Sequence, residues 1–142
     1  MTRIEFLHDA PDKLVAACRL IGELYGQGLR IVVYAPDAQT AQRLDRSLWT
    51  QPAISFVPHC AADSPLAGET PVVIASSLDG AAGDAVLINL DGELPPGFAR
   101  FERLIELVGA DEADRLPARE RYRFYRDRGY PIESRSLTAR DR

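Results

Sequence analysis

Short apolar runs and longer amphipathic stretches alternate along the first third of the chain. Residues 3–8 and 30–35 have the length of strands, and the second run resembles a strand buried on both faces of a parallel sheet. Between these runs, apolar residues recur at the spacing of one helix face; they are Leu14, Val15, Cys18, Ile21, Leu24 and Tyr25. We expect Asp9 to cap this helix and Pro11 to lie in its first turn.

The same alternation continues through the middle of the chain. Asp37 is placed to cap a second helix, whose apolar face carries Ala41, Leu44, Leu48 and Trp49. Residues 50–71 contain several prolines and predict an irregular segment, whereas 72–75 and 85–90 predict two more buried strands. The pattern indicates an α/β fold: a Rossmann-like three-layer domain with a mainly parallel sheet, formed by residues 1–142 as one domain.

Two helices are predicted in the last third of the chain. The first carries apolar residues at helical spacing, namely Phe98, Phe101, Leu104, Ile105 and Val108. The second is expected to begin at Asp111 or Asp114, which places Pro117 in its first turn, where no intrahelical hydrogen bond is lost. Residues 131–142 are polar, and we expect this tail to fray, at least beyond residue 137.

The overall composition is that of a soluble globular protein, with 46% hydrophobic and 27% charged residues and a net charge of −4. No apolar run approaches the roughly 18 residues of a membrane span, and the N-terminal residues lack the order of a secretory signal. We therefore expect a cytoplasmic protein. The pair His59–Cys60 offers only two of the four ligands of a structural zinc site, so no bound metal is expected.

The turn after the first predicted strand bears on nucleotide binding. The chain contains neither of the phosphate-binding sequences G-x-x-x-x-G-K-[ST] and G-x-G-x-x-G. Residues 8–11 include an aspartate and a proline where a phosphate requires free backbone N–H groups. We therefore expect a fold that lacks a nucleotide-binding loop and binds no cofactor. For catalysis, the candidates are His8 and His59, and neither stands in a recognisable motif.

Arginines are concentrated near the C-terminus. Residues 115–128 contain six arginines against Glu120 and Asp127, which gives a local charge of +4 on an acidic chain. Four of these arginines form one stripe on a helix, namely Arg115, Arg119, Arg123 and Arg126. The stripe predicts a site for an anionic partner, with Tyr122 as an aromatic wall beside it. The alternative is a solvated helix face whose charges pair locally, for example Glu120 with Arg123.

A second group of large side chains lies where the second helix meets the proline-containing segment. Residues 48–59 contain the only tryptophan of the chain, Trp49, together with Phe56 and Pro58. Aromatic side chains on a loop are typical of the hot spots of protein–protein interfaces. From the sequence alone, Trp49 and Phe56 are equally well explained as core residues.

These two groups together resemble one protein family. Residues 43–49, 52–59 and 118–126 are similar, in this order and spacing, to the chi subunit of bacterial DNA polymerase III, the accessory protein of the clamp loader. The predicted order of elements also fits, so the resemblance covers nearly the whole chain; it is weakest over residues 61–70 and after 132. It implies a Rossmann-like fold without catalysis and a function as an adaptor of the replication machinery.

Chi proteins bridge two partners, and the resemblance implies a surface for each on this chain. The pocket for the acidic C-terminal tail of single-stranded DNA-binding protein maps onto Arg115, Arg119, Tyr122 and Arg123. The surface for the psi subunit of the clamp loader, or for a helicase, maps onto Trp49, Phe56 and Pro58. The protein would then act in the cytoplasm at the nucleoid, through the replisome.

The residues themselves agree with this assignment. A peptide that ends in an apolar residue requires a guanidinium group for its terminal carboxylate and an apolar pocket for its side chain. Arg119 is placed for the first role, and Arg115 and Arg123 for the acidic residues upstream. The apolar wall is expected from Val108, Leu104 and Tyr122. One rival is direct nucleic-acid binding by the same helix, against which the pI of about 5.2 argues, so we expect nucleic acid to be bound only indirectly. The other is a small-molecule enzyme that uses His8 or His59.

Overall fold

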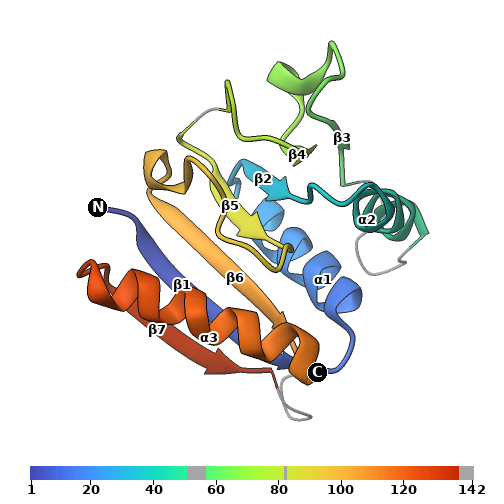
Figure 1. The fold of residues 1–142 in the computed structure, drawn as a ribbon. Coiled ribbons are helices and arrows are strands. Elements are labelled where there is room, and N and C mark those ends of the chain that lie inside the picture. The colour runs from blue at the N-terminus through green and yellow to red at the C-terminus, as the bar shows by residue number, and fades with distance from the viewer. Residues whose placement is uncertain (51–56, 82, 138–142) are drawn as a thin grey trace.

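The computed structural model describes residues 1–50, 57–81 and 83–137 (Figure 1). The strands are β1 (Arg3–Ala10), β2 (Ile31–Tyr34), β3 (His59–Ala61), β4 (Val72–Ala75), β5 (Val86–Asn89), β6 (Arg103–Gly109) and β7 (Ile132–Ser136). The helices are α1 (Lys13–Gly26), α2 (Ala38–Thr50) and α3 (Glu112–Asp127), and the 3-10 turns are η2 (Ala67–Glu69) and η3 (Phe98–Arg100).

The seven described strands form one sheet in which all neighbours are parallel, in the order β3-β4-β2-β5-β6-β1-β7. Helices α1 and α2 pack on one face of the sheet and α3 packs on the other. This arrangement confirms the predicted α/β, Rossmann-like three-layer fold. None of the helices in the described ranges is long and apolar enough to cross a membrane.

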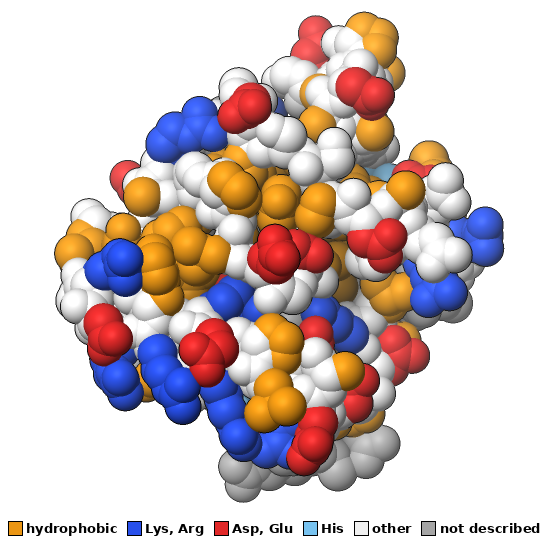
Figure 2. Space-filling model, viewed as in Figure 1, with side chains coloured by type: hydrophobic (Ala, Val, Ile, Leu, Met, Phe, Trp, Pro, Cys, Tyr) orange, Lys and Arg blue, Asp and Glu red, His pale blue; other side chains and the backbone are white. Residues whose placement is uncertain are grey.

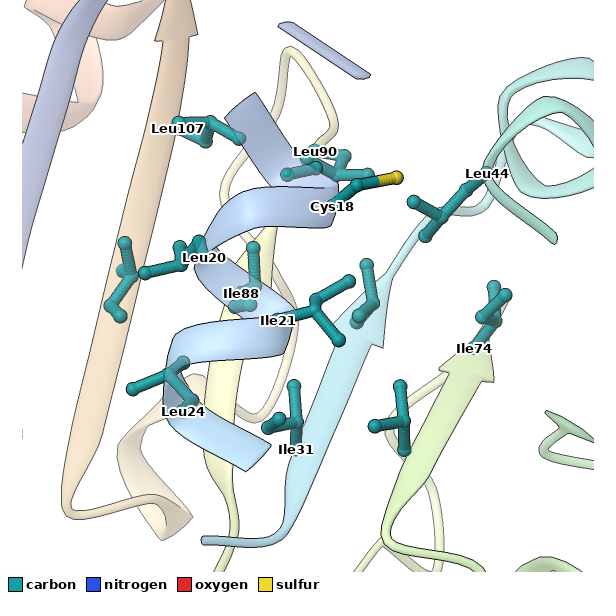
Figure 3. Packing of buried hydrophobic residues seen from close by; sticks show 14 of the residues in the cluster. Cys18, Leu20, Ile21, Leu24, Ile31, Leu44, Ile74, Ile88, Leu90 and Leu107 are labelled. Carbon is teal, nitrogen blue, oxygen red and sulfur yellow. The ribbon is translucent and has the colours of Figure 1, made fainter. Parts of the chain in front are cut away.

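The sheet separates two hydrophobic cores. On the α1 side, Ile21 and Leu44 pack with strand residues such as Ile31 and Ile88 (Figure 3). On the other side, the aromatic ring of Tyr125 on α3 is fully buried among residues of the strands and of η3. Burial of side chains of this size stabilises a fold by about 1.5–3 kcal/mol each, so α3 is held to the sheet by its inner face.

The structure corrects the predicted start of the first helix and confirms that of the second. Asp12, not Asp9, caps α1, because its carboxylate accepts hydrogen bonds from the backbone N–H groups of Leu14 and Val15, both at 3.1 Å. Strand β1 continues past Asp9, which has a φ of 63°, in the left-handed region, and so cannot start the helix. Asp37 caps α2 as predicted, because its carboxylate accepts a hydrogen bond from the backbone N–H of Gln39 at 3.4 Å and a second one from the Thr40 hydroxyl at 2.9 Å.

The prediction of a helix around residues 98–108 is wrong. Only residues 98–100 form a helical turn, and β6 follows from 103 to 109 in the middle of the sheet. The apolar spacing fits a helix, but residues 104–108 are also an unbroken run of buried side chains, as expected of a central parallel strand. Short apolar runs permit both interpretations. Here the segment forms a strand because it pairs with β5 on one side and β1 on the other.

The polar tail and the segment 50–71 also contain strands that were not predicted. Residues 132–136 form β7, which pairs with β1 at one edge of the sheet, so the fraying predicted for the whole tail is wrong there. The strand is polar because an edge strand packs on fewer neighbours and often carries charge. Residues 138–142 lie outside the described residues. At the opposite edge, residues 59–61 form the short strand β3.

Helix α3 begins with Asp111 as its N-cap residue, one of the two predicted starts. Pro117 is consequently the sixth helical residue and lies in the second turn, not in the first as predicted. Its missing N–H leaves the carbonyl group of Ala113 without an intrahelical donor.

Asp114, the other predicted start, connects α3 to its neighbours. Its carboxylate accepts a hydrogen bond from the backbone N–H of Gly109 and one from Lys13 at 3.1 Å, which ties α3 to β6 and α1.

Candidate functional site

A pocket of about 260 Å³ lies between α3 and the strands β1, β6 and β7. It is lined by Phe6, His8, Asp9, Val108, Arg115, Ala118, Arg119, Tyr122 and Ser134. The structure therefore brings together four residues that the sequence assigned to one pocket, namely Arg115, Arg119, Tyr122 and Val108. Arg123, the fifth, does not line it, and neither does Leu104, which is fully buried. The contribution of β7 was missed because the edge strand that supplies Ser134 was not predicted. The contribution of β1 was missed because its packing beside α3 is not stated by any local pattern.

The floor of the pocket is apolar. Val108 at the end of β6 and Ala118 on α3 are buried, and the ring of Tyr122 packs on Phe6 with 5.4 Å between centroids. Tyr122 itself is partly exposed, so its ring forms a wall between the floor and solvent. An apolar side chain that enters the pocket can therefore be shielded from water beside the guanidinium groups of α3.

The exposed arginines of α3 divide into paired and unpaired groups. Arg123 pairs with Glu120 at 2.8 Å, and Arg126 pairs with Asp127 at 3.1 Å. Arg115 and Arg119 are exposed and make no ion pair with any residue in the described ranges. The alternative interpretation of the stripe was a helix face whose charges pair locally. It holds for Arg123 and Arg126 but not for the two arginines at the pocket. Figure 2 shows the basic side chains of this region together with the acidic ones between them.

Arg121 is not part of the exposed stripe. It is only 4% exposed, and its Nε donates a hydrogen bond at 3.1 Å to the carboxylate of Glu106, which is fully buried on β6. Tyr125 and Asn89 donate to the same carboxylate at 2.6 and 2.9 Å. Arg121 also donates to the carbonyl group of Gly92 at 2.7 Å. This network fixes the rotation of α3 on the sheet and so determines which arginines face the pocket.

Burial raises the pKa of Glu106, and the charge of Arg121 with the hydrogen bonds from Tyr125 and Asn89 opposes that rise. Burial and the neighbouring carboxylate raise the pKa of Tyr125, so its hydroxyl group remains a donor. Because three donors meet one carboxylate, the network satisfies a charge that would otherwise be costly in the core. Its role is structural, since none of its members lines the pocket.

Three polar residues meet at the rim of the pocket. The hydroxyl of Ser136 donates to Asp9 at 2.7 Å, and Nδ1 of His8 lies 3.0 Å from the same carboxylate oxygen. The hydrogen bond from Ser136, together with the charges of His8 and Arg115, lowers the pKa of Asp9. Ser136 donates to the carboxylate and not to the imidazole, so the three are not arranged as a Ser-His-Asp triad.

The second predicted surface lies at the other edge of the sheet. Trp49, at the end of α2, is 68% exposed, and Pro58 is also exposed, whereas Phe56 lies outside the described residues. A core position is therefore wrong for Trp49. Its side chain borders an open cavity of about 1030 Å³ at the carboxyl ends of β2 and β4. Since β3 and β7 are opposite edges of the sheet, the two candidate surfaces are separate.

Comparison with known proteins agrees with the resemblance. The model of the family "DNA polymerase III chi subunit, HolC" matches residues 1–133. The chain is 33% identical to DNA polymerase III subunit chi of Pseudomonas aeruginosa over 141 residues, which covers 96% of this chain and 98% of the relative. It is 32% identical to the subunit of Escherichia coli K12, with 88% and 84% covered. The subunit of Haemophilus influenzae is 27% identical, with 85% of each chain covered.

Solved structures share the fold at low sequence identity. The C-terminal domain of S. cerevisiae Dbp5, bound to Gle1 and IP6, has a TM-score of 0.66 at 14% identity and covers 99% of this chain and 93% of its own. Another structure of the C-terminal domain of the DEAD-box protein Dbp5 has a TM-score of 0.59 at 15% identity. At this identity the likeness shows the fold alone. The family match and the curated relatives show more: the chain belongs to the chi subunit family of DNA polymerase III, accessory subunits in DNA replication.

Proposed function

We propose that the protein is a non-catalytic adaptor that joins two replication partners. The pocket beside α3 binds the acidic C-terminal tail of single-stranded DNA-binding protein, and the surface around Trp49 binds the psi subunit of the clamp loader, or a helicase in its place. One observation carries the first assignment. The two arginines of α3 without an ion pair among the described residues, Arg115 and Arg119, both line the apolar-walled pocket.

The chemistry of the pocket suits the end of a peptide. A guanidinium group donates two parallel hydrogen bonds to a carboxylate, and the apolar floor accepts the last side chain. The volume of about 260 Å³ is below the ~300–1,000 Å³ typical of pockets for drug-sized ligands and cofactors. The remaining acidic residues of the tail then lie along the exposed basic face of α3.

Direct binding of nucleic acid is the second candidate, and the surface favours it less. Glu120 and Asp127 stand between the arginines of α3, and the whole chain is acidic, with a net charge of −4. Proteins that bind single strands offer a continuous basic groove with several aromatic platforms. Among the residues that line this pocket, Tyr122 is the one exposed tyrosine, phenylalanine or tryptophan.

Calorimetry with two forms of the tail peptide tests the first assignment. A peptide with a free terminal carboxylate should bind more tightly than the same peptide with a C-terminal amide. The expected difference is about 1.5–3 kcal/mol, or roughly 10- to 150-fold, the usual contribution of hydrogen bonds to a charged group. Added salt should weaken the binding of both peptides, because part of the attraction is between exposed charges.

A single-stranded oligonucleotide serves as the comparison ligand in the same titration. Equal affinity for the acid and amide peptides contradicts the carboxylate assignment. Tighter binding of the oligonucleotide than of the acid peptide favours the nucleic-acid function instead.

Trp49→Ala tests the second surface. The complex with the psi subunit should be weakened by about 2 kcal/mol or more, as for an interface hot spot, while the tail peptide still binds. The melting temperature should change little, because the indole is 68% exposed. Tyr25→Ala, on the exposed part of α1, is a matched control that should leave both partners bound. Unchanged psi binding by Trp49→Ala, in analytical gel filtration and calorimetry, is the contrary result.

A further inference from the structure

Strand β1 contains an extra residue at the rim of the pocket beside α3. The pairing of β1 with β6 shifts by one residue between positions 7 and 10, so His8 and Asp9 stand opposite one residue of β6. Asp9 has a φ of 63°, and among the residues that the structure describes it is the one residue other than glycine with a positive φ. Irregularities of this kind are over-represented beside functional sites, where they redirect a side chain.

The irregularity brings two neighbouring side chains of β1 into the same pocket. Successive side chains of a regular strand point to opposite faces of the sheet, so only one of His8 and Asp9 would face α3. Here both line the pocket together with Arg115 and Arg119. A carboxylate from the strand side thus lies in a pocket whose arginines come from α3 (Figure 1).

The carboxylate of Asp9 is only partly used by the protein itself. Its contacts with the hydroxyl of Ser136 at 2.7 Å and with Nδ1 of His8 at 3.0 Å are both made by Oδ2. Oδ1 accepts no hydrogen bond from any residue in the described ranges, and the side chain is 39% exposed. The hydrogen bond from Ser136 contributes most to lowering the pKa of Asp9, so the group is charged near neutral pH. Its charge and its second oxygen are available to a ligand.

We propose that Asp9 is a specificity-determining residue of the tail-binding pocket, where it excludes a second carboxylate from the place of the last peptide side chain. The terminal carboxylate is attracted to the guanidinium groups of α3, and the last side chain enters over Val108 and Ala118. An acidic side chain at that position would lie beside Asp9, and like charges across an interface are disfavoured. The pocket thus distinguishes an acidic peptide with an apolar end from acidic peptides in general. The inference rests on the proposed function of this pocket.

The arginines of the pocket do not cancel the charge of Asp9. Arg115 is close enough for its charge to lower the pKa of Asp9, yet the two form no ion pair within the described residues. Two arginines against one aspartate still attract the terminal carboxylate from the side of α3. The repulsion of a second carboxylate comes from the side of β1.

A double-mutant cycle, measured by competition with a labelled tail peptide, tests the proposal. Two peptides carry the tail sequence with the last residue replaced by aspartate or by the isosteric asparagine, so both lose the apolar side chain equally. Asp9→Asn should improve binding of the aspartate peptide about two- to fivefold more than binding of the asparagine peptide, the size of an interaction between partly exposed charges. Asp9→Asn should also tighten binding of the tail peptide itself, because the pocket loses a negative charge.

The variants are chosen to keep the fold and to isolate the position of the charge. Asparagine adopts a positive φ more readily than most residues, and its amide oxygen can still accept the hydrogen bond from Ser136. If Asp9→Asn is unstable, Asp9→Gly adopts the same φ without strain and should remove the discrimination as well. Asp111→Asn is the matched control, because Asp111 makes no capping hydrogen bond with its side chain and does not line the pocket.

The relative affinity for the two substituted peptides decides the outcome. An unchanged ratio in Asp9→Asn, or an equal change in Asp111→Asn, overturns the proposal. Weaker binding of all peptides by Asp9→Asn at an unchanged ratio also overturns it and assigns Asp9 to the support of the pocket. If the wild type binds no tail peptide, or binds its acid and amide forms equally, the proposed function fails and this inference with it. Preference for the acid form with an unchanged ratio contradicts the role of Asp9 alone.

Discussion

Arg121→Met should lower the free energy of unfolding by about 3–5 kcal/mol, the loss expected when one partner of a buried ion pair is removed. The substitution leaves the carboxylate of Glu106 in the core with hydrogen bonds from Tyr125 and Asn89 but without a positive charge. Methionine fills a volume similar to that of arginine, so a cavity contributes little to the loss. Urea denaturation monitored by circular dichroism measures the change.

Arg123→Met is the matched control, two residues further along the same helix. Arg123 is 59% exposed in its ion pair with Glu120, and exposed pairs contribute only about 0–1 kcal/mol. A similar loss for both substitutions would contradict the assignment of Arg121 to the core. It would indicate that helix propensity or net charge causes the effect.

The loss in Arg121→Met should also depend on pH. Burial raises the pKa of Glu106 above its usual 4.5, and the substitution removes the charge that opposes this rise. A group with a raised folded-state pKa favours folding below its unfolded pKa, and this contribution is lost as the pH rises through the folded value. The destabilisation should therefore be smaller near pH 4.5 than near pH 8.

The parts of the fold that the sequence predicted are those with a single dominant signal. The strand at 72–75 and the helix capped by Asp37 have clear apolar runs, periodicity and a capping residue. Strand β6 was misassigned because its apolar residues satisfy the helical period as well, and only the neighbouring strands decide between the two. Strand β7 was missed because a polar edge strand is specified by its pairing with β1, which a local pattern does not contain.

Of the candidate site, the sequence predicted three residues of α3 and Val108 of β6, but not the contributions of β1 and β7. The spacing of Arg115, Arg119 and Tyr122 was enough to place them on one face, because a helix fixes its own geometry. The rim residues His8 and Asp9 depend on how β1 and α3 pack, which no local pattern states. Arg121 carried a usable signal: it is spaced by three and four from Ala118 and Tyr125, the buried face of α3.

Arg119→Ala should weaken binding of the acidic tail peptide by about 2 kcal/mol or more, roughly 30-fold. In the proposed complex, Arg119 donates charge-assisted hydrogen bonds to the terminal carboxylate, and alanine cannot replace them. The side chain is exposed and has no ion pair within the described ranges, so the fold should keep its melting temperature. Calorimetry with the free-acid peptide measures the loss, and thermal denaturation checks the fold.

Arg126→Ala removes the same charge from the same helix and is the control. Arg126 pairs with Asp127 and does not line the pocket, so its loss should weaken binding by only a few tenths of a kcal/mol through long-range charge. An equal effect of both substitutions would show that the helix attracts the tail by net charge alone. No effect of Arg119→Ala would place the carboxylate elsewhere. A large loss confined to Arg119→Ala, combined with indifference of that variant to amidation of the peptide, would identify its guanidinium as the group that binds the terminal carboxylate.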